Sequence, residues 1–373
     1  MSQTPNWHPE RLATRLPFLR RRAELTAAVR TFLSDRGYME VETPALVPAP
    51  GMEVHLRGFA TDYRPHLGVG ADTRLWLRTS PEMALKRLLV AGAGPVFEFA
   101  RVWRNGEASP RHAPEFTMLE WYAPALTMAE LMTETELLVR SVAPQMVAHG
   151  DVGCDLSLPF ERLSVETAFS RHCRGLDILG TVDARTGEGD AARLRAAANR
   201  VGLFIPETDS WEDGFFRLML QWVEPRLGRG RATFLTHWPT PQAALSRRDP
   251  RDGRQALRFE LFVAGLELAN AFEELTDPAE QRARFERDVA ARRDITGERG
   301  WEVDEDFLAA LEFGMPAASG IALGFDRLAM LASGAADIED VQWLPALPRQ
   351  PLAAIVAPPK LLAAPTLPAQ AAE

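Results

Sequence analysis

Two strand-like segments that follow one another closely constrain the fold of this chain more than any other feature. Residues Pro95 to Trp103 and Glu115 to Tyr122 have the composition and length of β-strands, and the polar stretch from Asn105 to Pro114 predicts a hairpin loop between them. A doubly wound parallel sheet would instead show a helix between successive strands. The sequence therefore predicts an α+β fold in which an antiparallel sheet is flanked by helices.

Further helices and strands are predicted on both sides of this hairpin. We expect helices over Glu24 to Arg36, from Ser80-Pro81-Glu82, from Asp277 to Glu280 onward and over Phe325 to Leu331, and strands at Met39 to Glu42, Leu75 to Thr79, Phe259 to Leu275 and Ser319 to Leu323. The polar stretch from Asp177 to Arg217 predicts a helical peripheral segment within one domain over residues 1–348. Residues 349–373 are rich in Pro and Ala, and we expect a mobile tail.

Composition and charge argue against several classes of function. The formal net charge of −9 over 373 residues disfavours sequence-independent binding to nucleic acid. Cys154 and Cys173 are too few for a disulfide framework or a zinc cluster, and no apolar run is long enough to span a membrane, so we expect a cytoplasmic protein. Lys86 and Lys360 are the only lysines, which leaves two candidates for catalysis through a Schiff base.

The predicted hairpin carries the densest group of candidate binding residues. Strand alternation places Phe116, Met118, Glu120 and Tyr122 on one face, which would suit a ligand with a cationic group and a flat ring. The loop adds three residues that suit phosphate groups, namely Arg104, Arg111 and His112. A solvated hairpin with ordinary charges is the alternative interpretation.

Two later segments and one helix start add weaker signals. Glu267 to Glu274 interleaves carboxylates with apolar residues, and buried carboxylates require a cation or a metal. Glu267 and Glu274 are seven residues apart, so a bulge or turn is needed if they face one site, and solvent exposure of one of them is the alternative. The glycines of Gly320 to Arg327 would let a ligand approach the backbone, although a structural turn also explains them. Ser80 and Glu82 could equally be helix-capping residues.

Taken together in this chain order, these segments resemble the catalytic domain of the class II aminoacyl-tRNA synthetases. Val29 to Pro44 is similar to motif 1, Arg104 to Tyr122 to motif 2 and Gly320 to Arg327 to motif 3. The resemblance is to the lysyl-tRNA synthetase group, through Ser80-Pro81-Glu82 with Lys86-Arg87-Leu88, Pro114 to Met118, and Glu267 to Asn270. Within that group, Ala322 in motif 3 and the segments Gly92 to Phe97 and Glu115 to Tyr122 are similar to the ligases that act on elongation factor P. Motif 1 also lies close to Met1, where we expect no anticodon-binding barrel.

The resemblance implies a reaction and a set of residue roles. ATP would activate lysine or (R)-β-lysine as an adenylate, with Mg²⁺, and the aminoacyl group would pass to a lysine side chain of elongation factor P. Motif 1 would form a homodimer. The implied catalytic residues are Arg104, Arg327, Glu267 and Glu274, with Mg²⁺ on Glu267 and Glu274. The implied amino-acid site is Ser80, Glu82, Glu120, Tyr122, Glu274 and Ala322. The implied nucleotide site is Arg104, Asn105, Glu107, His112, Phe116, Glu267, Leu268, Asn270, Gly324 and Arg327.

Two other functions remain open from the sequence. One is a truncated lysyl-tRNA synthetase that charges tRNA, which the net charge and the expected absence of an anticodon barrel disfavour. The other is a non-catalytic paralogue that binds an amino acid, because Gly106 and Ala113 stand where the family usually has glutamate and asparagine. The presence of Arg104, Glu267, Glu274 and Arg327 argues against the second.

Overall fold

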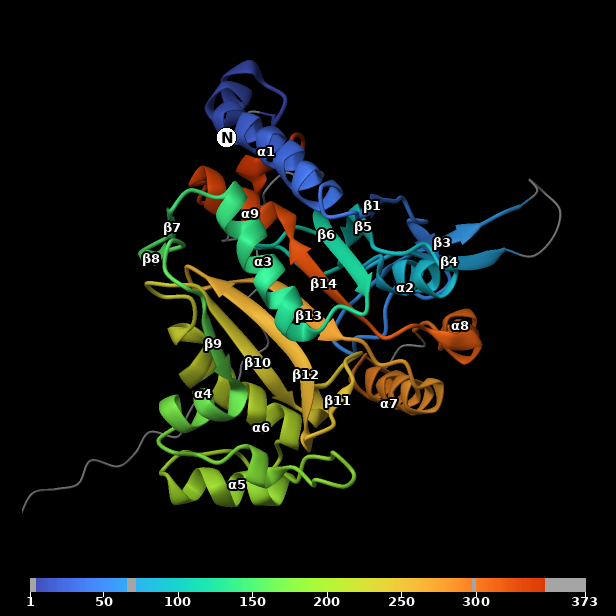
Figure 1. The fold of residues 1–373 in the computed structure, drawn as a ribbon, viewed down its shortest axis with the longest axis vertical. Coiled ribbons are helices and arrows are strands. Elements are labelled where there is room, and N and C mark those ends of the chain that lie inside the picture. Colours follow the sequence, from blue (N-terminus) through green and yellow to red (C-terminus); the bar gives the residue numbers. More distant parts are fainter. Residues whose placement is uncertain (1–4, 66–71, 297–299, 346–373) are drawn as a thin grey trace, which may run out of the picture.

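A nine-stranded mixed sheet forms the centre of the computed structural model, which describes residues 5–65, 72–296 and 300–345 (Figure 1). The order of its strands is β1 (Met39–Glu40), β5 (Val96–Trp103), β6 (Glu115–Pro124), β14 (Ala318–Gly324), β13 (Leu266–Glu273), β12 (Asp252–Val263), β10 (Thr233–Pro239) and β9 (Glu161–Ser164), with β11 (Arg248–Asp249) on β12. Only the outermost pairs, β1–β5 and β10–β9, are parallel. The α+β fold with a largely antiparallel sheet is therefore confirmed. The expected tail at 349–373 lies outside the described residues.

Helices α1 (Pro9–Ser34), α3 (Met128–Val142) and α9 (Phe325–Ser333) cover one face of this sheet (Figure 1). Their apolar side chains form one continuous core with the strand residues that point toward them, among them Leu119, Trp121 and Ile321. On the other face, α2 (Glu82–Val90), α7 (Pro278–Thr296) and α8 (Glu305–Gly314) pack around a second core that includes Tyr122 and Phe272. Strand residues that alternate with those of the first core point to the other face of the sheet, where they can line a site.

A separate helical lobe packs against the β9–β10 end of the sheet. It contains α4 (Val165–His172), α5 (Ala191–Arg200), α6 (Trp211–Leu218), the π-helix η2 (Met219–Val223), and the 3₁₀ helices η1 (Leu179–Thr181) and η3 (Glu224–Arg226). The lobe has a core of its own, in which Phe215 stacks on both Phe169 and Trp211. Figure 1 shows α4, α5 and α6 together at the end of the molecule away from α1.

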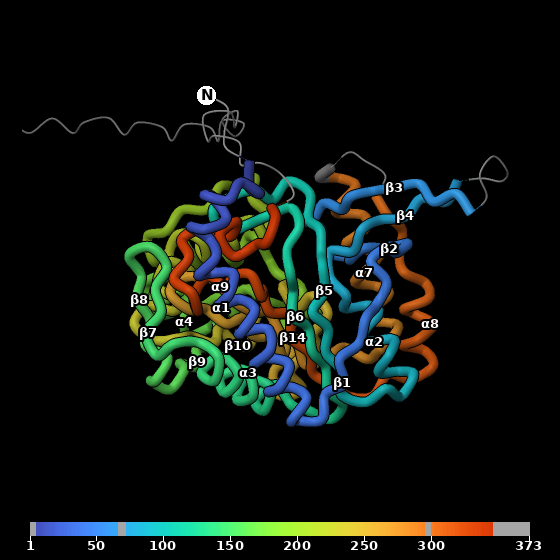
Figure 2. Tube along the Cα trace, turned by 90° about the horizontal axis from the view of Figure 1, so that it is seen from above, coloured from blue at the N-terminus to red at the C-terminus, as the bar shows by residue number. Residues whose placement is uncertain are grey.

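Short elements complete the described chain. A three-stranded sheet contains β2 (Leu46–Val47), β4 (Thr73–Leu77) and β3 (Phe59–Tyr63), and β7 (Met146–His149) pairs with β8 (Val152–Asp155). The remaining 3₁₀ helices are η4 (Thr240–Gln242) and η5 (Ile338–Val341). Figure 2 shows that β3 and β4 project from the body of the molecule. No helix in the described ranges is long and apolar enough to cross a membrane.

Two elements differ clearly from the sequence-based expectation, while β1 and β4 differ from the expected strands only by two residues at their ends. The strand expected over Phe259 to Leu275 is two strands, because Ala264 and Gly265 adopt φ values of 51° and 74° and form a tight hairpin turn between β12 and β13. The helix expected over Glu24 to Arg36 begins at Pro9. Tertiary contacts stabilise its first turns, since buried Arg15 donates to the carbonyl of Gln342.

Candidate active site

Strand register brings the candidate residues into two rows on the face opposite α1 and α9. Across β5, β6, β14, β13 and β12, the first row is Glu98, Glu120, Ala322, Asn270 and Glu260, and the second is Val96, Tyr122, Gly320, Phe272 and Arg258. The prediction that Glu120 and Tyr122 share a face is confirmed, because the alternating residues Leu119 and Trp121 lie in the opposite core. The hairpin and motif 3 segments therefore belong to one surface.

A β-bulge in the β12–β13 pair settles how the carboxylates of β13 are directed. The register shifts so that Leu261 pairs with Ala269 while Phe262 pairs with Glu267. Leu268 and Ala269 consequently both point into the core, and Glu267 lies on the same face as Asn270. The bulge that the seven-residue spacing required is thus present.

The expectation that Glu267 and Glu274 hold one magnesium ion is wrong on geometric grounds. Seven residues of extended strand span roughly 20 Å, which is far beyond the reach of two ligands of one ion. Glu267 is also 46% exposed, whereas the side chain of Glu274 is fully buried and ion-paired with Lys86. The two carboxylates therefore belong to opposite ends of the site.

A buried acidic cluster occupies the Glu274 end. Helix α2 places Glu82 one turn before Lys86, and the Lys86 ammonium nitrogen lies 2.6 Å from Glu82 Oε1 and 2.5 Å from Glu274 Oε2. On β6, the Tyr122 hydroxyl donates to Glu120 Oε2 at 3.0 Å. Ser80, in the turn before α2, accepts a weak hydrogen bond from the Glu82 backbone N–H at 3.4 Å. Four of the predicted amino-acid-binding residues therefore lie in one buried cluster with Lys86, namely Glu82, Glu120, Tyr122 and Glu274.

This cluster carries more negative than positive groups. Burial raises the pKa of Glu120 well above its ordinary value, and the nearby Glu82 adds to the shift. Burial would lower the pKa of Lys86, but Glu274 and Glu82 outweigh it and the pKa is raised. Glu120 Oε1 and Glu274 Oε1 accept no hydrogen bond from any described residue. Buried carboxylate oxygens without donors mark a place for a cationic ligand.

Because residue 320 is glycine, the backbone of β14 leaves room for the Tyr122 ring. A Cβ atom there would stand 2.0 Å from a Tyr122 ring carbon and 2.8 Å from Glu274 Oε1. The Tyr122 ring can therefore lie directly on the backbone of β14. Ala322 lies next along the same face and packs against Met118.

A basic cluster occupies the other end of the site. Arg327, at the start of α9, donates to the backbone oxygen of Glu267 at 2.7 Å and lies 2.8 Å from His112 Nε2. Burial together with Arg327, Arg111 and Arg104 lowers the pKa of His112 to about 4, so this ring is neutral at pH 7. The Arg104 guanidinium lies over the Phe116 ring at 5.2 Å. Guanidinium groups gathered around a neutral imidazole suit a polyanion such as a triphosphate.

The other predicted nucleotide residues take different positions. Glu107 lies 3.9 Å from Arg104, and Gly324 is the N-cap residue of α9. Asn105 is exposed in the hairpin loop, where its backbone N–H donates to Arg57. Leu268 is 2% exposed and points into the core, so only its backbone could contact a ligand.

Sequence reasoning missed two residues of this surface, Glu260 and Arg258. Arg258 donates to Glu260 Oε1 at 2.6 Å and to Asn270 Oδ1 at 3.1 Å. Glu267 pairs with Phe262, which lies two residues after Glu260 on the same face of β12, so Glu260 rather than Glu274 is the carboxylate near Glu267. Burial and the proximity of Glu267 raise the pKa of Glu260 to about 8. A Glu and an Arg alternating within an apolar strand were the available signal. No group of three or more metal-binding side chains occurs in the described residues.

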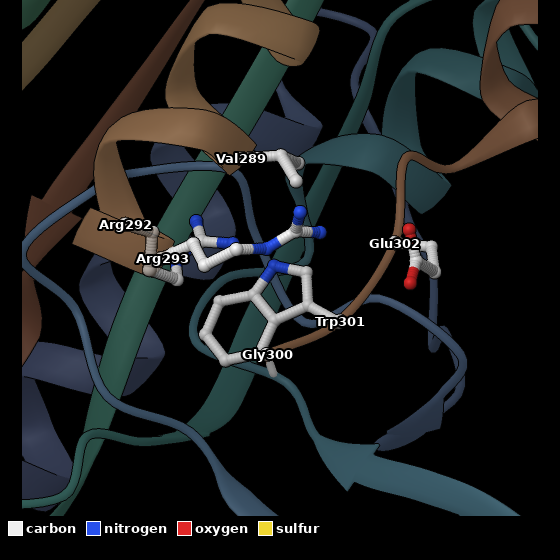
Figure 3. A pocket seen from close by; sticks show the side chains of 6 residues that line it. All are labelled: Val289, Arg292, Arg293, Gly300, Trp301 and Glu302. Carbon is white, nitrogen blue, oxygen red and sulfur yellow. The ribbon is translucent and has the colours of Figure 1, made fainter. Parts of the chain in front are cut away.

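A shallow pocket beside Trp301 lies outside this site (Figure 3). The Arg292 guanidinium covers the Trp301 ring at 4.0 Å. The Trp301 indole donates to the carbonyl of Gly51, and Arg292 donates to that of Glu53. These contacts have a sufficient structural role, because they hold the loop before β3 against the end of α7.

Comparisons with known proteins agree with this geometry. The family model described as tRNA synthetases class II (D, K and N) matches residues 12–348. The chain is 42% identical to the elongation factor P–(R)-β-lysine ligase of Klebsiella pneumoniae subsp. pneumoniae over 345 residues, which cover 91% of this chain and 98% of that protein. Ligases with the same name from Pectobacterium atrosepticum and Salmonella dublin are 42% and 41% identical to this chain, again over 91% of this chain and 98% of each relative. The chain therefore belongs to the class II tRNA synthetase family of the D, K and N type.

Proposed function

We propose that this protein uses ATP to activate lysine or (R)-β-lysine and transfers the aminoacyl group to a lysine side chain of elongation factor P. Relatives that match nearly their whole length are named as ligases of this kind. The observation that carries the proposal is the opposite charge of the two ends of one sheet face. Buried carboxylates without donors lie at the Glu274 end, and guanidinium groups gather around His112 at the other.

The acidic end would bind both amino groups of the substrate. Glu82, with Ser80, would take the amino group close to the carboxylate, and Glu120, Tyr122 and Glu274 would take the distal ammonium. Charge-assisted hydrogen bonds from a buried ammonium to these oxygens would be strong. An amino acid with a neutral side chain would leave the carboxylates unpaired and would be rejected.

The basic end would bind ATP. Arg104 would contact the α-phosphate and Arg327 the γ-phosphate, and Phe116 and Arg327 would enclose adenine. Glu267 and Glu260 are the carboxylates that would hold a magnesium ion, because the register of β12 and β13 places them near one another on the same face. When bound, the ion would neutralise phosphate charge. Asn270 shares Arg258 with Glu260 and would help orient that carboxylate.

The chemistry needs no covalent attachment to the protein. A carboxylate oxygen of the amino acid attacks the α-phosphorus, and pyrophosphate leaves. The neutral amine of the acceptor lysine then attacks the carbonyl carbon of the adenylate, loses a proton and displaces AMP. The residues on this face bind and orient the reactants and stabilise the charge that develops on phosphate.

The decisive experiment measures transfer by intact mass. Purified protein is incubated with ATP, Mg²⁺ and either lysine or (R)-β-lysine, and with either elongation factor P or tRNA as acceptor. The expected result is a single aminoacyl addition to elongation factor P that disappears when its acceptor lysine is changed to arginine. Efficient charging of tRNA would favour a tRNA synthetase instead, and no activation with either amino acid would favour a binding protein.

We also propose that the working form is a homodimer assembled through motif 1.

A further inference from the structure

The acidic end of the site contains a cation of its own that the steps above do not use. Lys86 is 1% exposed, and its ammonium nitrogen contacts Glu82 Oε1 and Glu274 Oε2 at 2.6 Å and 2.5 Å. These are carboxylates that we assign to the two different amino groups of the substrate. Lys86 therefore lies between the two ammonium sites.

The contact joins elements that are otherwise separate in the chain. Glu82 and Lys86 share α2, whereas Glu274 follows the last residue of β13. Burial raises the pKa of Glu274, Lys86 opposes that shift, and Glu82 adds to it. Without the lysine, two buried carboxylates on different elements would repel each other and separate or take up protons.

Glu274 keeps one oxygen for a ligand. Lys86 contacts Oε1 of Glu82 and Oε2 of Glu274, while Glu274 Oε1 accepts no hydrogen bond from a described residue and lies close to Gly320. We propose that Lys86 is a positioning residue that sets the spacing between the two ammonium sites and so selects the length of the diamino substrate. This inference rests on the proposed function of the site.

Kinetics of ATP–pyrophosphate exchange test the proposal without any acceptor. In Lys86→Met we expect the KM for lysine to rise at least about a hundredfold while the KM for ATP stays within about threefold of wild type. The preference for lysine over ornithine, whose amino groups are one methylene closer, should narrow at the same time. Lys86→Arg keeps the charge but moves it, so we expect an intermediate KM for lysine.

A matched variant separates positioning from general destabilisation. Arg87 is the next residue of α2, but its guanidinium contacts Asp304 and Asp306 at 3.1 Å rather than the acidic cluster. Arg87→Met should lower the melting temperature and leave both KM values unchanged.

Three results would overturn the positioning role. They are a wild-type KM for lysine in folded Lys86→Met, equal rises of both KM values, or an unchanged preference over ornithine. If Lys86→Met does not fold, Lys86→Arg decides, and a wild-type KM for lysine there contradicts the proposal. Absence of exchange in the wild-type protein with lysine and with (R)-β-lysine is a different result, which refutes the proposed function itself.

Discussion

At the scale of single residues, the site is defined by which charges have partners. Glu98, which lies in the same row as Glu120, has a donor for each oxygen, because Arg78 donates to Oε1 at 2.7 Å and the Thr43 hydroxyl donates to Oε2 at 2.6 Å. Glu120 and Glu274 instead keep oxygens that accept nothing. A buried polar group without a partner is costly, so its retention indicates a ligand rather than a role in stability.

The basic end should carry most of the charge stabilisation in the activation step. We expect Arg327→Ala and Glu267→Ala each to reduce ATP–pyrophosphate exchange at least about a hundredfold, the usual effect of removing one preorganised charged group. Arg101→Ala is a suitable control, because Arg101 on β5 is half exposed and its ion pair with Glu115 is long, at 3.7 Å. Exchange at the wild-type rate in either site variant would show that these residues have been misassigned.

The protonation of His112 offers a second test at this scale. Its pKa is lowered from 6.5 to about 4 by burial and three arginines, so the folded protein should keep the ring neutral until the pH falls toward 4. Because unfolded chains protonate histidine near 6.5, this group should reduce stability as the pH falls from 6.5 to 4. A bound triphosphate should raise the pKa of His112, because its negative charges would offset those of the arginines. Nuclear magnetic resonance titration with and without ATP measures the pKa of His112 in both states. A pKa near 6.5 without ATP would contradict the arrangement of the three arginines around this ring.

At the scale of elements, β14 controls how closely the strands and side chains can approach. Gly320→Ala should displace the Tyr122 ring, because the new Cβ would overlap it at 2.0 Å. We expect a clear loss of thermal stability and a KM for lysine raised by at least about tenfold, since Tyr122 would no longer hold Glu120. Gly153→Ala in β8 is the control, because a Cβ there meets nothing within 4 Å. Equal behaviour of the two variants would mean that Tyr122 can move freely.

The neighbouring position on β14 should influence which isomer is activated. Ala322 lies in register between Glu120 and Asn270, and its methyl group would reshape the site near the reacting carboxylate in the proposed complex. Removing one methyl from a tight pocket changes discrimination by roughly 1–3 kcal/mol, so Ala322→Gly should shift the preference from (R)-β-lysine toward α-lysine. Activation kinetics with both isomers provide the measurement, and an unchanged ratio would exclude Ala322 as a determinant.

At the scale of the whole molecule, local patterns identified elements better than partners. The hairpin, the Asp277 helix start and the passage from β14 into α9 were all predictable, because alternation and capping act over a few residues. The carboxylate that lies near Glu267 was not predictable. Its position depends on the register between β12 and β13 and on a bulge, which the sequence of one strand does not reveal. Lys86 was visible only as a rare lysine and as part of the resemblance to the lysyl-tRNA synthetase group, because its contact with Glu274, 188 positions later in the chain, is formed only by folding.

Assembly is the last prediction, and it concerns the edge of the main sheet. Within the described residues, β1 pairs only with β5, so its other edge is available, and Met39 on this strand is 51% exposed. Leu25, Val29 and Leu33 of α1 pack inward, which leaves the opposite side of the helix and β1 as the expected two-fold contact.

A stable dimer needs roughly 1,200 Å² of buried surface, and a charge placed at the centre of this interface should disrupt the dimer. Light scattering should therefore show a dimer for the wild type and for Met146→Asp, whose methionine is 61% exposed on β7, but a monomer for Met39→Asp. A wild-type protein that is monomeric at micromolar concentration while catalysing exchange would exclude motif 1 as an obligatory interface.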